Sequence, residues 1–352
     1  MTAAIDEIQS ALQLHNSGRH AAGVVPRTLV ELLANHAPAA LSISGAEQTA
    51  WNGQVVEAGE GILGLAHWDG TLHLDRECIL DPLREMYSRS GLIQSDAMLT
   101  RYREALVTML HEQSHFLGPS GATQEAARQA FKQPGSRALE EGVAEAWAHA
   151  HLDDYLTTLG VDQVAPGIDQ VQALPSYQAF VPAVTLLTAD LDERAGLPAG
   201  ETLRALNRET AEGQWPLVVD LVYRSSALPE CVPPNREPVV RLRLENTLRE
   251  SFRSLEDFEG HPRGYEAARS KSTARQCIDR LNTEIQTAER YFQAPTRTPD
   301  QATALRSALS GLAPPKTPAQ SRPTTTAGAE VTNRTRQRIQ PTPTPLRGQG
   351  DG

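Results

Sequence analysis

The sequence predicts an α+β fold that is mostly helical and carries a small sheet in its N-terminal part. Residues 101–110 lack Gly and Pro and place Leu106, Met109 and Leu110 three and four positions apart, the spacing of a buried helix face. Residues 61–75 alternate apolar and polar side chains around Asp69-Gly70, which is typical of a hairpin. With 352 residues and 39% apolar content, the chain can bury a substantial core.

The elements are expected in the following order. Residues 5–14 and 27–35 form helices, and 41–43 and 54–56 form short strands. The hairpin 61–75, a helix at 100–117 and a second helix at 137–156 complete a first domain, 1–160. A helical subdomain follows at 161–293, including an antiparallel pair at 240–258 and 263–292 joined across Gly260-His261-Pro262.

The hairpin predicts a particular register. A two-residue type I′ turn at Asp69-Gly70 sets Leu65 opposite Leu74 and His67 opposite Leu72. One face of the hairpin would then carry Leu63, Leu65, Leu72 and Leu74 and pack on the helices.

Residues 111–115 read His-Glu-Gln-Ser-His, the HExxH pattern of a zinc site. Positions four apart lie on one helix face, so His111 and His115 converge on one point where a single Zn²⁺ ion can bind. Glu112 points about 100° around the helix and therefore lies beside the ion, as a general base for a water molecule that the ion activates.

A catalytic zinc ion needs a third protein ligand. The HExxHxxGxxH continuation of the metzincins fails here, because Gly121 occupies the position of the third histidine. The helix at 137–156 instead offers Glu140, Glu141 and Glu145, of which Glu141 and Glu145 lie one turn apart. Spacing alone leaves all three open as ligands.

With this glutamate helix the chain resembles the gluzincin metallopeptidases, the group that includes thermolysin, and the first domain would be zincin-like. The resemblance implies that Glu141 is the third ligand and that Glu145 fixes the tautomer of a liganding histidine. Thermolysin itself has an aspartate at the position of Glu145. The run Ala66-His67-Trp68-Asp69-Gly70 is similar to the edge strand of thermolysin-like enzymes, which makes Ala66, His67 and Trp68 candidate substrate contacts.

Other polar residues of the second helix fit the metal site less well. His149 and His151 lie about 12 and 15 Å along the helix axis from Glu141, too far to share its ion. Tyr155 and Tyr177 are candidates for stabilising an oxyanion, although both also fit a packing role.

The chain is therefore expected to be a zinc-dependent metallopeptidase acting on a peptide or protein substrate. Two alternatives remain: an inactive zincin-fold scaffold or binding protein, and a toxin or effector protease with one protein target. The intact Glu112 favours an active enzyme over a scaffold. Substrate identity, endo- or exopeptidase action and oligomeric state do not follow from the sequence.

The composition also limits the cellular location and the binding partners that we expect. Neither a signal peptide nor an apolar run of membrane-spanning length is found, so we expect a cytoplasmic protein, with export by another route left open. The three cysteines lack CxxC spacing and indicate no thiolate zinc site. Residues 294–352 are rich in Pro, Thr and Arg, which predicts a disordered tail. The tail has eight basic and three acidic residues; we expect an inert tail, with weak contacts to an anionic partner such as nucleic acid as the alternative.

Overall fold

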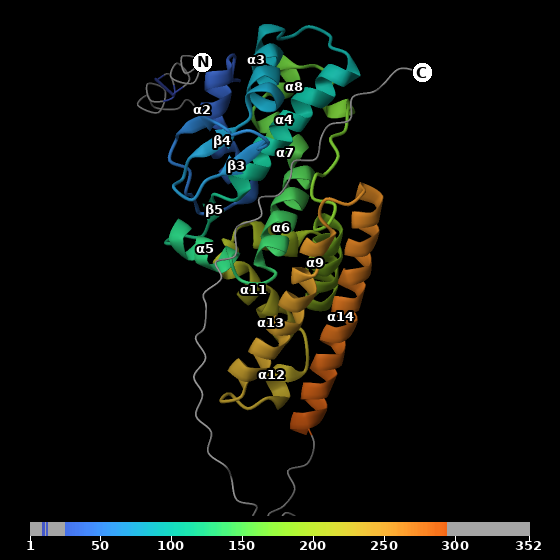
Figure 1. The fold of residues 1–352 in the computed structure, drawn as a ribbon. Coiled ribbons are helices and arrows are strands. Elements are labelled where there is room, and N and C mark those ends of the chain that lie inside the picture. The colour runs from blue at the N-terminus through green and yellow to red at the C-terminus, as the bar shows by residue number, and fades with distance from the viewer. Residues whose placement is uncertain (1–8, 11, 13–24, 294–352) are drawn as a thin grey trace, which may run out of the picture. The chain divides into compact units, whose positions relative to one another are not determined.

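The computed structural model describes residues 9–10, 12 and 25–293 of the chain. The described residues up to Arg290 belong to one compact unit, which contains every element that positions the candidate site. The described part of the chain is mostly helical with two small sheets, and this confirms the expected α+β class (Figure 1). The domain borders at residues 160 and 293 stay predictions, and the expected tail lies outside the described residues.

The secondary-structure elements fall into three groups along the chain. The elements that precede the site are α2 Leu29–Ser44, β1 Gln48–Thr49, β2 Val55–Glu57, β3 Gly64–Ala66, β4 Leu72–Leu74, η1 Arg76–Leu80 and α3 Asp81–Ser88. The elements around the site are α4 Asp96–Ser114, β5 Leu117–Gly118, α5 Gln124–Phe131, α6 Ser136–Ala150, α7 Leu152–Thr158, α8 Val161–Val164 and η2 Ile168–Gln170. The elements that follow are α9 Val181–Ala195, α10 Glu201–Asn207, α11 Ala211–Arg224, α12 Leu228–Cys231, α13 Glu237–Arg253, η3 Glu256–Phe258 and α14 Arg263–Gln293.

Helix α2 differs from the sequence prediction at its C-terminal end. It runs past the expected end at residue 35, through Pro38, and includes residues 41–43, where the predicted strand was wrong. The helix continues because Ala39 and Ala40 on its inner face are buried, so tertiary packing outweighs the loss of one helical hydrogen bond at proline. It ends at Gly45, whose φ of 70° only glycine adopts readily. The predicted helix 5–14 lies mostly outside the described residues.

The hairpin is present, but its predicted register was wrong by one residue. Leu65 pairs with His73, whereas Gly64 pairs with Leu74 and Ala66 with Leu72. His67 pairs with Thr71, so the loop between the strands contains three residues, 68–70, instead of two. The third of them, Gly70, has a φ of 89° and forms a bulge that follows the turn.

This shift exchanges the two faces of β3. Leu63 and Leu65 lie exposed, while Leu72 and Leu74 of β4 are buried. In the three-stranded sheet, β4 lies between β2 and β3, so β3 is an edge strand of this sheet. The predicted strand at 54–56 is confirmed as β2, which pairs with β4 in parallel.

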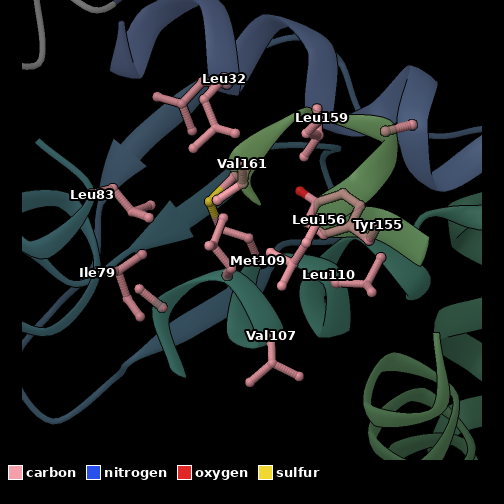
Figure 2. Close-up of a cluster of buried hydrophobic side chains, with 14 of the residues drawn as sticks. Leu32, Ile79, Leu83, Val107, Met109, Leu110, Tyr155, Leu156, Leu159 and Val161 are labelled. Carbon is pink, nitrogen blue, oxygen red and sulfur yellow. The ribbon is translucent and has the colours of Figure 1, made fainter. Parts of the chain in front are cut away.

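Helix α4 holds the HExxH motif and lies between the sheet and α6 (Figure 1). The Ser95 hydroxyl caps its first turn by accepting from the Met98 N–H. Its inner side, including Leu106, Met109 and Leu110, is fully buried. Figure 2 shows Met109 and Leu110 packed with side chains of α2, α3 and α7. This core fixes the rotation of α4 and so the direction in which its histidines point.

Helix α6 is central to the fold, because it contacts α4 on one side and α9, α11 and α13 on the other. The expected helix 137–156 is broken near His151 into α6 and α7. Gly142 allows the close approach of α9: a Cβ atom there would lie 2.6 Å from Val184 Cγ2 and 3.1 Å from Phe180 Cβ. Contacts on both sides therefore hold the glutamates of α6 in place.

The C-terminal helices follow the predicted pattern closely. The break at Gly260-His261-Pro262 separates α13 from α14, and an ion pair between Arg243 and Glu284 joins the two helices. Helix α14 also contacts α9, where the Ser270 hydroxyl accepts from the Ala183 N–H. No helix among the described residues combines the length and apolar character needed to cross a membrane.

Candidate metal centre

The two histidines of the motif lie at the buried C-terminal end of α4. His111 is in the last turn, and His115 is the residue that follows the helix, still in helical conformation. Immediately after it, β5 pairs with β1 through Gln48↔Gly118 and Thr49↔Leu117. The Gln113 side chain also donates to Thr49 Oγ1 at 2.7 Å. These bonds hold the end of α4, and with it His115, against strand β1.

Three side chains from α4 and α6 converge on one point. His111 Nε2 lies 3.1 Å from His115 Nε2, and Glu141 Oε2 lies 3.4 Å from the first nitrogen and 3.6 Å from the second. Ligands held at about 2.0–2.1 Å from a tetrahedral ion are roughly 3.3 Å apart. The measured separations fit that value, so His111, His115 and Glu141 could hold a metal ion.

The other ring nitrogen of each histidine faces a carboxylate of α6. His111 Nδ1 lies 2.8 Å from Glu145 Oε2, and His115 Nδ1 lies 2.6 Å from Glu140 Oε1. His115 Nδ1 is hydrogen-bonded to Glu140, and in a neutral ring this bond would place the proton on Nδ1 and leave the Nε2 lone pair for a metal ion. The two Nε2 atoms face each other and Glu141 Oε2, and this oxygen is buried and has no hydrogen-bond partner in the described part of the chain. A cation placed between these three atoms would give each of them a partner.

The pKa values of the three residues also favour positive charge on the two histidines. Burial lowers the pKa of His111, but the contacts with Glu141 and Glu145 outweigh it and raise the pKa well above 6.5. Burial also lowers the pKa of His115, and the charge and hydrogen bond of Glu140 raise it to about 9. Burial raises the pKa of Glu141, yet its contact with His111 and the charge of His115 bring it below its ordinary value. These shifts favour protonated histidine rings next to an ionised Glu141 carboxylate.

Glu112 lies next to this cluster and is 7% exposed. Its Oε2 accepts a hydrogen bond of 2.8 Å from the Ala66 N–H of β3. Burial raises the pKa of Glu112, and the nearby charges of His111 and His115 oppose that rise. Glu112 is thus a buried carboxylate with a raised pKa beside three side chains that could hold a metal ion.

Tyr177, between η2 and α9, lies against the same cluster. The Tyr177 ring stacks on His111, with centroids 5.4 Å apart and planes at 9°. The charge of Glu141, followed by burial, raises the pKa of the Tyr177 phenol well above 10, so its hydroxyl stays protonated. Glu145 Oε1 accepts from the Ser176 N–H, and His149 Nε2 lies 3.3 Å from the same oxygen. Glu145 thus links the metal site to the segment that carries Tyr177.

The remaining sequence candidates are distributed as follows. Tyr155 lies in the hydrophobic core and is fully buried (Figure 2). His151 stacks on Trp147 beyond the end of α6. His67 is exposed and lies 2.9 Å from Asp69 Oδ1, while the half-buried Trp68 packs edge-on against Phe131 of α5. Among the three residues expected to contact substrate, Ala66 is thus the one with a hydrogen bond to Glu112.

Comparison with known proteins gives no match: no family model, curated protein or solved structure is similar to the chain. The assignment of the site therefore depends on its own residues.

Two contributors were missed from the sequence. Glu140 was considered only as an alternative ligand, although it faces His115 Nδ1. Ser176 carried no signal, because only the fold brings its N–H to Glu145. The sequence did offer one signal for Glu140. It directly precedes the candidate ligand Glu141 on the same helix, so its side chain points to the neighbouring helix face.

Proposed function

We propose that the protein is a zinc-dependent metallopeptidase of gluzincin type that hydrolyses peptide bonds. The observation that carries this proposal is the convergence of His111, His115 and Glu141 beside the buried carboxylate of Glu112. Two imidazoles and one carboxylate are a ligand set of catalytic zinc sites. A zinc ion bound there would supply a Lewis acid and lower the pKa of a water molecule in its open position.

Glu112 is proposed as the group that moves the proton. A carboxylate whose pKa is raised by burial accepts a proton more readily than an exposed one at the same pH. In the proposed reaction it takes a proton from the attacking water and later delivers that proton to the leaving amine. A water-excluded position next to the ligands is suited to both steps.

The free edge of β3 is the proposed binding site for an extended substrate. The His67 N–H donates to the Thr71 carbonyl and the Asp75 N–H to the Leu63 carbonyl, so in and beside β3 the backbone of residues 63, 65 and 67 faces β4. The backbone groups of Gly64 and Ala66 consequently point to the other side, where the Ala66 N–H reaches Glu112. The remaining groups at this edge can pair with a peptide next to the site.

Tyr177 is the proposed donor to the developing oxyanion. Its protonated hydroxyl belongs to a ring stacked on His111, next to the charge of Glu141. A donor held in a buried site costs little reorganisation when negative charge develops on the substrate.

The test is cleavage of a denatured-protein panel and a peptide library by the zinc-loaded protein, with Glu112→Gln as the decisive variant. The amide keeps the shape of the side chain but not its basicity, so kcat should fall by about 10²–10⁴-fold with zinc still bound. Glu104→Gln is the matched control, because Glu104 is exposed on the same helix. Equal activity of Glu112→Gln and the native protein would overturn the mechanism. A native protein that binds zinc and cleaves nothing would favour an inactive scaffold.

A further inference from the structure

The edge strand β3 touches Glu112 at two places. The first is the hydrogen bond of 2.8 Å from the Ala66 N–H to Glu112 Oε2. This N–H is free for Glu112 because Ala66 lies at a position of β3 whose backbone points away from β4. The hydrogen bond therefore costs the sheet none of its own bonds.

The second contact is the close approach of Gly64. A Cβ atom at this position would lie 2.7 Å from both Glu112 Cγ and Glu112 Oε1, and 3.0 Å from Cδ. Such distances are far below normal van der Waals contact, so the carboxylate fits only because residue 64 has no side chain. Gly64 is not at a positive φ, which means that its backbone conformation would accept alanine. Space for Glu112 is the reason that the structure offers for glycine here.

We propose that Gly64 and the Ala66 backbone are positioning residues for Glu112, one giving the carboxylate its space and the other holding one of its oxygens. This inference rests on the proposed peptidase function for its catalytic meaning, but the contact itself does not depend on it. A side chain held from two sides has few alternative rotamers, and a base displaced by about 1 Å can lose roughly 10²-fold in rate.

The contact is tested by a double-variant cycle in thermal unfolding, which needs no activity. Gly64→Ala forces Glu112 to move, so the unfolding midpoint should fall by about 3 °C or more in the native background. In the Glu112→Ala background the inserted methyl group has room, and the same substitution should shift the midpoint by less than about 1 °C. Equal shifts in both backgrounds would show that Gly64 does not act through Glu112.

The positioning role is tested by kinetics at equal zinc content. Gly64→Ala should lower kcat by about 10–10²-fold and leave KM within about twofold of the native value. Gly59→Ala is the control, because a Cβ atom there would meet nothing closer than Ile62 Cδ1 at 4.0 Å. A native kcat in Gly64→Ala would overturn the positioning role even where the stability cycle supports the contact.

Ala66→Pro tests the hydrogen bond separately. Proline removes the N–H that Glu112 accepts, and on the free side of an edge strand it breaks no ladder bond. A fall in kcat with unchanged KM would support the role of the Ala66 N–H in positioning Glu112. A rise in KM with unchanged kcat would instead assign this N–H to substrate binding and overturn the proposal. If the native protein cleaves no peptide, the peptidase function fails, and the stability cycle alone decides whether the contact exists.

Discussion

The three glutamates of α6 should differ sharply in their effect on zinc affinity. Glu141 Oε2 faces both Nε2 atoms, at 3.4 and 3.6 Å, so Glu141→Ala removes one of the three proposed ligands. Glu140 and Glu145 each face an Nδ1 atom, at 2.6 and 2.8 Å, and only orient the rings. Loss of such an orienting partner typically weakens metal binding by about 10–100-fold, or roughly 1.4–2.7 kcal/mol.

We therefore expect Glu141→Ala to lose more affinity than either neighbour. Glu145→Ala should cost more than Glu140→Ala, because Glu145 also accepts from the Ser176 N–H and orders the chain beside Tyr177. The assay is competition for zinc with a chromogenic chelator at pH 7.5, with circular dichroism as a check on folding. Glu104→Ala on the exposed side of α4 is the control. If Glu141→Ala binds zinc as well as the control while Glu140→Ala or Glu145→Ala does not bind, the ligand assignment is wrong.

Two further predictions concern protons and packing. The pKa of His115 in the metal-free fold, about 9, exceeds its ordinary 6.5, so its protonated ring stabilises that fold below pH 6.5 and this contribution is lost as the pH rises through 9. Zinc must displace that proton, so zinc affinity should rise from pH 6.5 to 9. Calorimetry of zinc binding at pH 7.5 in two buffers of different ionisation enthalpy should detect the released proton. Binding without proton release would contradict a protonated His115 in the metal-free protein. Gly142→Ala should destabilise the protein by about 1–3 kcal/mol in denaturant unfolding, because its Cβ would overlap Val184. Gly264→Ala, with open space at its Cβ, should not, and a harmless Gly142→Ala would show that α6 and α9 are less closely packed than described.

The part of the site that sequence could predict is the part fixed by one helix. His111, Glu112 and His115 lie within five residues, so helical geometry alone determines how they face one another. The choice among Glu140, Glu141 and Glu145 depends instead on how α6 is rotated against α4. That rotation comes from packing on both sides of α6, including the close contact at Gly142, which no local pattern encodes.

The errors in the fold have a similar origin. Asp69-Gly70 correctly predicted a turn, but the same two letters suit a two-residue loop and a three-residue loop with a bulge, and the two differ by one residue in register. Residues 41–43 suit a strand locally, yet they extend α2 because its inner face is buried. The hydrogen bond between Ala66 and Glu112 joins residues 46 positions apart and became visible only in the fold.

The most direct measurement for the metal centre is anomalous diffraction from crystals of the zinc-loaded protein, with data collected on both sides of the zinc absorption edge. We expect one strong peak per chain, within about 2.0–2.2 Å of His111 Nε2, His115 Nε2 and a Glu141 carboxylate oxygen. A zinc peak at another place in the chain, or no peak between these three side chains at full zinc loading, would contradict the ligand assignment.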